Sequence, residues 1–303
     1  MRDLDLFLEE CDRLSHCDAP DYLLWHYTSV DSLISIAKSQ VVRLTCYSFL
    51  NDPAEGQRFD LLLAAAWNAA IDSIGIHERF DLAYIRDISA TVRRVREQRD
   101  TDTETFLFSL SELGDSLSQW ARYGDDGSGV ALGFKVAPQQ FAPPREQPWS
   151  YGPFLHKVLY DWLSDTSPGL RPELADETAK FKDRLTELIR SYLVTVKFAD
   201  ETENAVYVLL ETLRAMFKQN AYHEEREWRL AAYTVSESRD LFEFRSTQFG
   251  LAPFMTVPLG PGLQLKEIRL GPKLTQENTR TATWLCRKYN IDACVSRSAF
   301  AYR

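Results

Sequence analysis

The residues best suited to chemistry lie between Glu224 and Arg229, a segment that reads Glu-Glu-Arg-Glu-Trp-Arg and directly precedes an apolar run. In an extended chain Glu225, Glu227 and Arg229 point to one face, because side chains alternate with a period of two. Two carboxylates beside one guanidinium can form structural ion pairs. They can equally bind a cationic or hydroxyl-rich substrate, with one acid positioned by the arginine. The spacing leaves both interpretations open.

Three further clusters combine polar groups with turn residues or aromatic rings. His26, in Trp-His-Tyr-Thr at the end of the first apolar run, can hydrogen-bond a ligand hydroxyl, act as a base or serve as a satisfied structural residue. In the loop that begins at Ser48, Asn51 or Asp52 can cap the following helix. The segment 118–130 is rich in glycine and aromatic residues, which can approach a ligand closely and stack on a planar ring, or pack in the core.

The common catalytic motifs are missing from the sequence. It has no GxxxxGK[ST] phosphate loop, no GxGxxG after a predicted strand, no HExxH zinc motif and no GxSxG elbow. The five cysteines form no CxxC pair, which disfavours a zinc knuckle or a disulfide framework. Free thiols are typical of a reducing compartment, so we expect a cytoplasmic protein and no structural metal.

Composition narrows the class of protein further. The 303 residues include 35 Lys and Arg against 44 Asp and Glu, a formal net charge of −9. This balance argues against a general nucleic-acid or anionic-membrane binder. No run of eighteen apolar residues occurs, so no transmembrane helix is predicted. The first residues are charged and lack the layout of a secretory signal.

The hydrophobic spacing predicts an α+β protein. Helices are expected at 4–14, 30–37 (capped by Thr28 or Ser29), 54–73, 80–99, 116–123, 173–193, 204–218 and 275–289. Strands are expected at 22–27, 41–45, 105–111, 130–134, 155–160, 228–233, 241–244, 255–259, 265–270 and 293–296, with loops at 48–53 and 136–153. We expect an N-terminal helix within residues 1–21 and one α+β domain over 22–303, with a mixed or antiparallel sheet and several surrounding helices.

Five motifs, taken in order, resemble a widespread bacterial family of unknown function. The family pattern can be written HYTs, FNDPxE, WxxYG, ExEWR and a terminal SxxxYR. The corresponding segments here are 25–29, 49–55, 120–124, 225–229 and 296–303. The chain departs from the second motif, because Leu50 stands between Phe49 and Asn51. The resemblance extends from about residue 22 to 303 and assigns no activity.

The pairing of His26-Tyr27-Thr28 with Glu225-Arg226-Glu227 also resembles ADP-ribosyltransferases, which split NAD at the nicotinamide–ribose bond. Those enzymes use a first-strand His or Arg, a middle-strand Tyr or Ser, and a late-strand Glu that often lies within ExE. The resemblance implies an ADP-ribosyltransferase-like fold, NAD as the substrate and no metal.

The same resemblance implies a role for each candidate residue. Glu227 would stabilise the oxocarbenium-like transition state and hold the ribose 2′-hydroxyl. Glu225 would orient or deprotonate the acceptor, and His26 would hydrogen-bond a ribose. Tyr47 or Tyr123 would stack on nicotinamide. Further cofactor contacts are expected from Tyr27, Thr28, Ser48, Asn51, Trp120 and Arg229, with Arg43, Arg122 or Arg229 near the phosphates.

Three functional hypotheses follow. The first is an intracellular NAD-dependent ADP-ribosyltransferase-like enzyme, with a toxin or phage-defence role as a family-level expectation. Its acceptor and its oligomeric state stay open. The second is a hydrolase or nuclease that uses His26, Asp52, Glu55, Glu225 and Glu227, with or without a divalent cation. The third is a non-catalytic sensor or interaction module, in which the polar motifs form a structural network.

Overall fold

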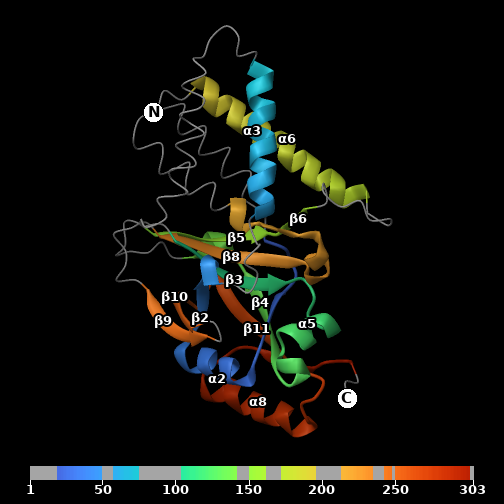
Figure 1. Cartoon of the computed structure of the whole chain (residues 1–303). Coiled ribbons are helices and arrows are strands. Elements are labelled where there is room, and N and C mark those ends of the chain that lie inside the picture. The colour runs from blue at the N-terminus through green and yellow to red at the C-terminus, as the bar shows by residue number, and fades with distance from the viewer. Residues whose placement is uncertain are drawn as a thin grey trace.

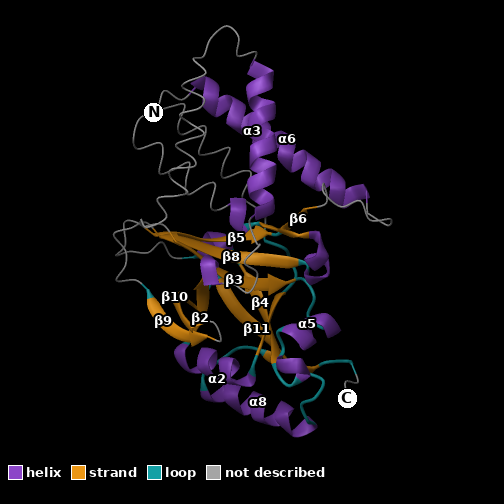
Figure 2. Cartoon of the chain, viewed as in Figure 1, coloured by secondary structure: helices purple, strands orange, loops and turns teal. Residues whose placement is uncertain are grey.

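The part of the chain that the structure describes forms one ten-stranded sheet and a small two-stranded sheet, with helices on the flanks (Figure 2). The structure is a computed structural model, and it describes residues 19–49, 57–74, 104–141, 150–161, 172–195, 213–234, 242–247 and 250–300. The expected helices at 4–14 and 80–99, residues 204–212 of the one expected at 204–218, and the candidate residues Asn51, Asp52 and Glu55 lie outside the described residues. The α+β class and the mixed sheet predicted from the sequence are confirmed.

The first strand and helix form where local sequence rules place them. Strand β1 (Leu24–Thr28) is followed by helix α2 (Val30–Ser39) and strand β2 (Val41–Cys46). The Ser29 hydroxyl caps α2 by accepting a hydrogen bond from the backbone N–H of Ser32 at 3.1 Å. Gln40 ends the helix in the left-handed region with φ 56°.

Most other elements lie where the hydrophobic spacing predicts them. They are α3 (Gln57–Ile74), β3 (Glu104–Ser111), α5 (Leu117–Arg122), β4 (Val130–Val136), β5 (Ser150–Lys157), β6 (Leu159–Asp161), α6 (Pro172–Thr195), β7 (Phe217–Gln219), β8 (Glu227–Thr234), β9 (Glu243–Thr247), β10 (Gly250–Pro258), β11 (Leu263–Leu270), α8 (Gln276–Lys288) and β12 (Cys294–Arg297). Single 3-10 turns cover Tyr47–Phe49, Asp125–Gly127, Pro138–Gln140 and Asn220–Glu225.

Several predicted boundaries were wrong, and two of them show why. Strand β5 begins at Ser150, inside a segment expected to be a loop, because it pairs with β8 from that residue onward. Phe217 and Lys218 were expected to end a helix over 204–218, but they belong to β7 (Phe217–Gln219), which pairs in parallel with β6. In both places pairing with a strand distant in sequence outweighs local propensity.

Strand β3 organises the sheet. It pairs with β8 along its full length, from Glu104 opposite Thr234 to Ser111 opposite Glu227. Its other edge is shared: β2 pairs at Phe106 and Leu107 near the start, and β1 pairs at Ser111 near the end. Strands β1 and β2 therefore diverge along one edge of β3, which leaves the backbone around Ser109 between them.

Two apolar clusters stabilise this arrangement. The larger one lies in the sheet and includes Leu33 of α2 and Ala282 of α8, which pack together at one end of the molecule (Figure 1). The second joins α3 and α6 to residues 213–217, and these two helices cross beyond the opposite end of the sheet (Figure 1). Strand β8 contributes Trp228, Leu230 and Ala232 to the larger cluster, and β3 and β5 pair with its two edges.

Candidate functional site

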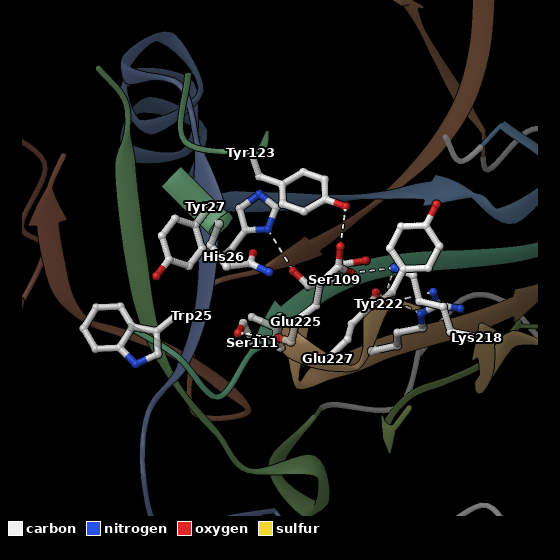
Figure 3. Close-up of a pocket in the computed structure, with 13 residues that line it drawn as sticks. Trp25, His26, Tyr27, Ser109, Ser111, Tyr123, Lys218, Tyr222, Glu225 and Glu227 are labelled. Atoms are coloured by element: carbon white, nitrogen blue, oxygen red, sulfur yellow. Dashed lines mark hydrogen bonds and ion pairs between the residues drawn. The ribbon is translucent and has the colours of Figure 1, made fainter. Parts of the chain in front are cut away.

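A cavity of about 220 Å³ opens where β1, β3 and the start of β8 meet. Aromatic rings, one histidine, two carboxylates and two cations surround it (Figure 3). Its lining comprises Trp25, His26, Tyr27, Ser109, Leu110, Ser111, Gln119, Tyr123, Lys218, Tyr222, Glu225, Glu227 and Arg229. The cavity therefore brings together the histidine of the first strand and the ExE segment, although about 200 residues separate them in the sequence.

The strand register explains why His26 and the ExE segment lie close together. Trp25 of β1 lies opposite Ser111 of β3, and Ser111 lies opposite Glu227 of β8. Neighbouring strands are about 4.8 Å apart, so two steps across the sheet place the backbones of Trp25 and Glu227 about 10 Å apart. His26 and Glu227 are thus close enough to contact one ligand.

His26 fills the gap left by the diverging strands. Its Nδ1 donates a hydrogen bond to the backbone carbonyl of Ser109 at 2.9 Å, because a carbonyl oxygen can only accept. The ring packs against Phe108 with centroids 4.2 Å apart. Burial lowers the pKa of His26 to about 4, so the imidazole is neutral near pH 7. With Nδ1 protonated, Nε2 is a hydrogen-bond acceptor for a ligand hydroxyl.

Lys218 connects the two glutamates of the ExE segment. Its Nζ donates to Oε2 of Glu225 at 2.7 Å and to Oε2 of Glu227 at 2.8 Å. Arg229, which is only 1% exposed, reaches Glu227 with two further hydrogen bonds, Nε to Oε1 at 3.0 Å and Nη2 to Oε2 at 3.2 Å. This fork-shaped contact fixes the plane of the Glu227 carboxylate.

Glu225 is held from the opposite side by the end of α5. Its Oε1 accepts hydrogen bonds from Nη1 of Arg122 at 3.1 Å and from the Tyr123 hydroxyl at 3.0 Å. A carboxylate offers about four acceptor positions. Hydrogen bonds within the described part of the chain fill three acceptor positions on Glu225 and three on Glu227. One position therefore stays open on each, at Oε2 of Glu225 and Oε1 of Glu227.

The charges around the cavity set the ionisation of Glu227. Burial by itself raises the pKa of Glu227, but the charges and hydrogen bonds of Arg229 and Lys218 outweigh it and lower the pKa to about 2. Glu227 is therefore a fixed anion and cannot act as a general acid near neutral pH. Burial, and then the charge of Glu225, raise the pKa of Tyr123, so its hydroxyl stays protonated as a donor.

The expected alignment of Glu225, Glu227 and Arg229 on one face is reached by an unexpected backbone. Glu225 ends a 3-10 turn, Arg226 adopts a left-handed conformation with φ 44° and ψ 53°, and only Glu227 begins the strand. All three side chains named in the prediction still line the cavity. The left-handed backbone at Arg226 therefore places Glu225 and Glu227 on the same side, as strand alternation was expected to do.

The structure distinguishes between the two tyrosines that were candidates for stacking on nicotinamide. Tyr123 lines the cavity, whereas Tyr47 packs against Leu107, Ala215 and Ala231 in another cluster. Tyr27 also lines the cavity, and its hydroxyl donates to the Leu113 carbonyl at 2.7 Å. Of the two alternatives, Tyr123 is therefore the aromatic residue at the cavity.

Other expected contacts lie elsewhere. Thr28, Ser48 and Trp120 are not among the residues that line the cavity. Trp120 is fully buried beside Tyr27, and its Nε1 donates to Asp115 at 2.7 Å. The guanidinium of Arg43 lies over the Phe254 ring, 4.8 Å from its centroid. Arg122 reaches the site through Glu225.

Sequence reasoning missed Lys218, Tyr222 and Ser109. Lys218 falls in a segment expected to be helical, so nothing placed its side chain near the ExE segment. One signal was available: two glutamates beside an apolar strand are buried only with a cation to neutralise them. Arg229 alone supplies one positive charge, so a second cation from another segment was required.

Two general features of the described residues complete the description. None of the helices in the described ranges is long and apolar enough to cross a membrane. Within the same ranges, no group of three or more His, Cys, Asp and Glu side chains is placed to hold a metal ion.

Comparison with known proteins locates a family match on the part of the chain that builds the site. Residues 119–230 match the family model described as "Protein of unknown function (DUF2971)". This range contains the WxxYG and ExEWR segments, with Tyr123, Lys218, Glu225 and Glu227. The resemblance to a family of unknown function is thus confirmed for these residues. Neither the curated proteins nor the solved structures include a match to the chain.

Proposed function

We propose that this protein is an ADP-ribosyltransferase-like enzyme that cleaves NAD between nicotinamide and ribose. One arrangement carries the proposal: His26, Tyr123, Glu225 and Glu227 line a single cavity. The sequence resemblance implies His26 for the first-strand position and Glu225 and Glu227 for the late one, and it leaves Tyr47 or Tyr123 for the middle one. Tyr123 is the candidate that lines the cavity, although it ends helix α5 and does not lie on a strand.

The size of the cavity suits part of NAD. Pockets that enclose a whole ligand usually measure about 300–1,000 Å³. A cavity of about 220 Å³ takes the nicotinamide–ribose half, and the adenosine half lies outside it. Tyr123 and Tyr222 present rings at the cavity wall for the flat nicotinamide.

The ionised Glu227 fits the charge that develops during cleavage. When the bond between ribose C1′ and the ring nitrogen breaks, its electron pair leaves with nicotinamide, and the ribose becomes positively charged. A carboxylate whose pKa is about 2 carries full negative charge at this step. Lys218 and Arg229 are positioning residues, because they orient this carboxylate and leave one of its acceptor positions open.

Hydrogen bonds to the ribose would come from three acceptors. These are Nε2 of His26, Oε2 of Glu225 and Oε1 of Glu227, whose side chains all line the cavity. The acceptor molecule then forms the new bond to C1′ and loses its proton. Glu225 lies near enough to the site to receive that proton.

The test is nicotinamide release from NAD, measured by chromatography. We expect release by the wild type, and a loss of at least about a hundredfold in Glu227→Gln, the size expected when a transition-state charge partner is removed. Glu243→Gln on the exposed strand β9 is the matched control and should keep wild-type release.

Because Glu227→Gln disturbs a buried network, His26→Gln provides a second variant. A glutamine amide can still donate to the Ser109 carbonyl, but it removes the imidazole acceptor. We expect at least about tenfold slower release with an unchanged melting temperature. A folded wild type that neither releases nicotinamide nor shows a thermal shift with NAD would overturn the proposal.

The full ion pairing of both glutamates favours one alternative, a non-catalytic ligand-binding module. In that case NAD raises the melting temperature, and no nicotinamide appears even at high protein concentration. Thermal shift and release measured on one sample separate the two functions.

A further inference from the structure

A second cavity, of about 440 Å³, lies beside the start of β8. Glu227 contributes to the walls of both cavities. The hydroxyl of Tyr160, which also lines the second cavity, accepts a hydrogen bond from the backbone N–H of Glu227 at 2.9 Å. The volume falls within the usual range for a small-molecule site. The proposed reaction with NAD assigns no ligand to this cavity.

Arg226 is turned into the second cavity by its backbone. Glu225 lines only the first cavity and Glu227 lines both, whereas Arg226 lines only the second. A left-handed conformation is unfavourable for a residue with a side chain, by about 1–3 kcal/mol. Two backbone hydrogen bonds hold it: Arg226 N–H donates to the His223 carbonyl at 3.2 Å, and Glu112 N–H donates to the Arg226 carbonyl at 3.1 Å.

In the second cavity, the guanidinium of Arg226 is available to bind an anionic ligand. The other cation, Lys157, pairs with Glu112 at 3.4 Å. Within the described residues, no ion pair neutralises the guanidinium of Arg226, and its side chain is exposed. A guanidinium presents paired N–H donors that match two oxygens of a phosphate.

Hydroxyl-binding groups line the same cavity as the two cations. Glu112 and Glu224 supply carboxylate oxygens, which accept from sugar hydroxyls. Ser116 and Ser118 share one hydrogen bond of 3.0 Å between their hydroxyls. Only one of the two protons is used in that bond, so the other can be donated to a ligand oxygen.

We propose that the second cavity binds a phosphorylated sugar, either free or as the sugar-phosphate part of a nucleotide. Arg226 and Lys157 contact the phosphate, and Glu112, Glu224 and the serine pair contact the sugar hydroxyls. This proposal does not depend on NAD cleavage, because it concerns equilibrium binding at other residues.

Isothermal titration calorimetry of the full chain without NAD tests the proposal, with ribose 5-phosphate, AMP and ribose as probes. We expect ribose 5-phosphate or AMP to bind and ribose to bind at least tenfold more weakly, since ribose lacks the phosphate. Equal affinities for the two phosphorylated probes indicate a free sugar phosphate. At least tenfold tighter binding of AMP indicates a nucleotide.

Variants locate the binding. Arg226→Gln should weaken it at least tenfold, and Lys157→Gln should weaken it too, whereas Arg287→Gln on the exposed face of α8 should not. His26→Gln, which alters only the first cavity, should leave it unchanged. The proposal is overturned if neither phosphorylated probe binds, if Arg226→Gln binds like the wild type, or if His26→Gln abolishes binding.

Discussion

The ammonium group of Lys218 lies 2.8 Å from Oε2 of Glu227, and the two side chains are only 9% and 5% exposed. The same ammonium reaches Glu225 at 2.7 Å. Two carboxylates can lie together in the protein interior only when cations neutralise them. Lys218 is therefore the residue that makes the ExE segment compatible with burial.

Replacing Lys218 with methionine should destabilise the protein strongly. The variant leaves Glu225 and Glu227 with less positive charge, and breaking a buried ion pair in this way costs about 3–5 kcal/mol. The free energy of unfolding in urea measures the loss. Lys266→Met is the matched control, because its pair with Asp292 is exposed and worth about 0–1 kcal/mol. Equal losses in the two variants would contradict a structural role for Lys218.

Acid should remove the stabilisation that comes from Glu227. The pKa of Glu227 is about 2 in the folded protein and near 4.5 in the unfolded chain. Its contribution is therefore complete above pH 4.5 and is lost as the pH falls toward 2. The free energy of unfolding, taken from denaturation curves at several pH values, should fall less steeply below pH 4.5 for Glu227→Gln than for the wild type. Parallel curves would show that Glu227 is not held as an anion.

His26 should act in a different pH window. Its folded pKa is about 4, against 6.5 for an unperturbed histidine. The unfolded chain therefore binds a proton first, and stability is lost as the pH falls from 6.5 to 4. Nitrogen-15 NMR should show a neutral ring with protonated Nδ1 at pH 6 and a titration midpoint near 4. A midpoint near 6.5 would show that the ring is open to water.

Gly129 should tolerate no side chain. A Cβ there would lie 2.2 Å from the Thr28 carbonyl oxygen at the end of β1 and 2.8 Å from that of Gly124. Both contacts are to backbone, so we expect Gly129→Ala to destabilise the protein by about 3 kcal/mol. Gly260→Ala, with no atom within 4 Å of its Cβ, should change the unfolding free energy little. A wild-type melting temperature for Gly129→Ala would show that the turn can move.

The sequence predicted the local features of the fold better than those of the site. The Ser29 cap, strand β1 and helix α8 follow from hydrophobic spacing and capping rules, which act over a few residues. Strand β7 did not follow, because its pairing with β6 joins residues about sixty positions apart.

The same distinction separates the site residues. Glu225 and Glu227 stood out because their type and spacing are local properties. Lys218 did not, because its contacts depend on how the chain approaches β8. Trp120 was expected near the cofactor for its ring, yet its burial beside Tyr27 is decided by packing that spacing alone does not determine.

The order of strands in the sheet also governs when the site can form during folding. Strand β1 at residues 24–28 pairs with β4 at 130–136, and β4 in turn pairs with β11 at 263–270. Such contacts have a high contact order, and loop closure over these distances makes folding slow. A chain still on the ribosome that lacks β8 can form helix α2 and strand β1, but not the wall of the cavity that Glu227 and Arg229 supply. We expect the cavity to appear late, after β8 in the C-terminal third of the chain has been synthesised.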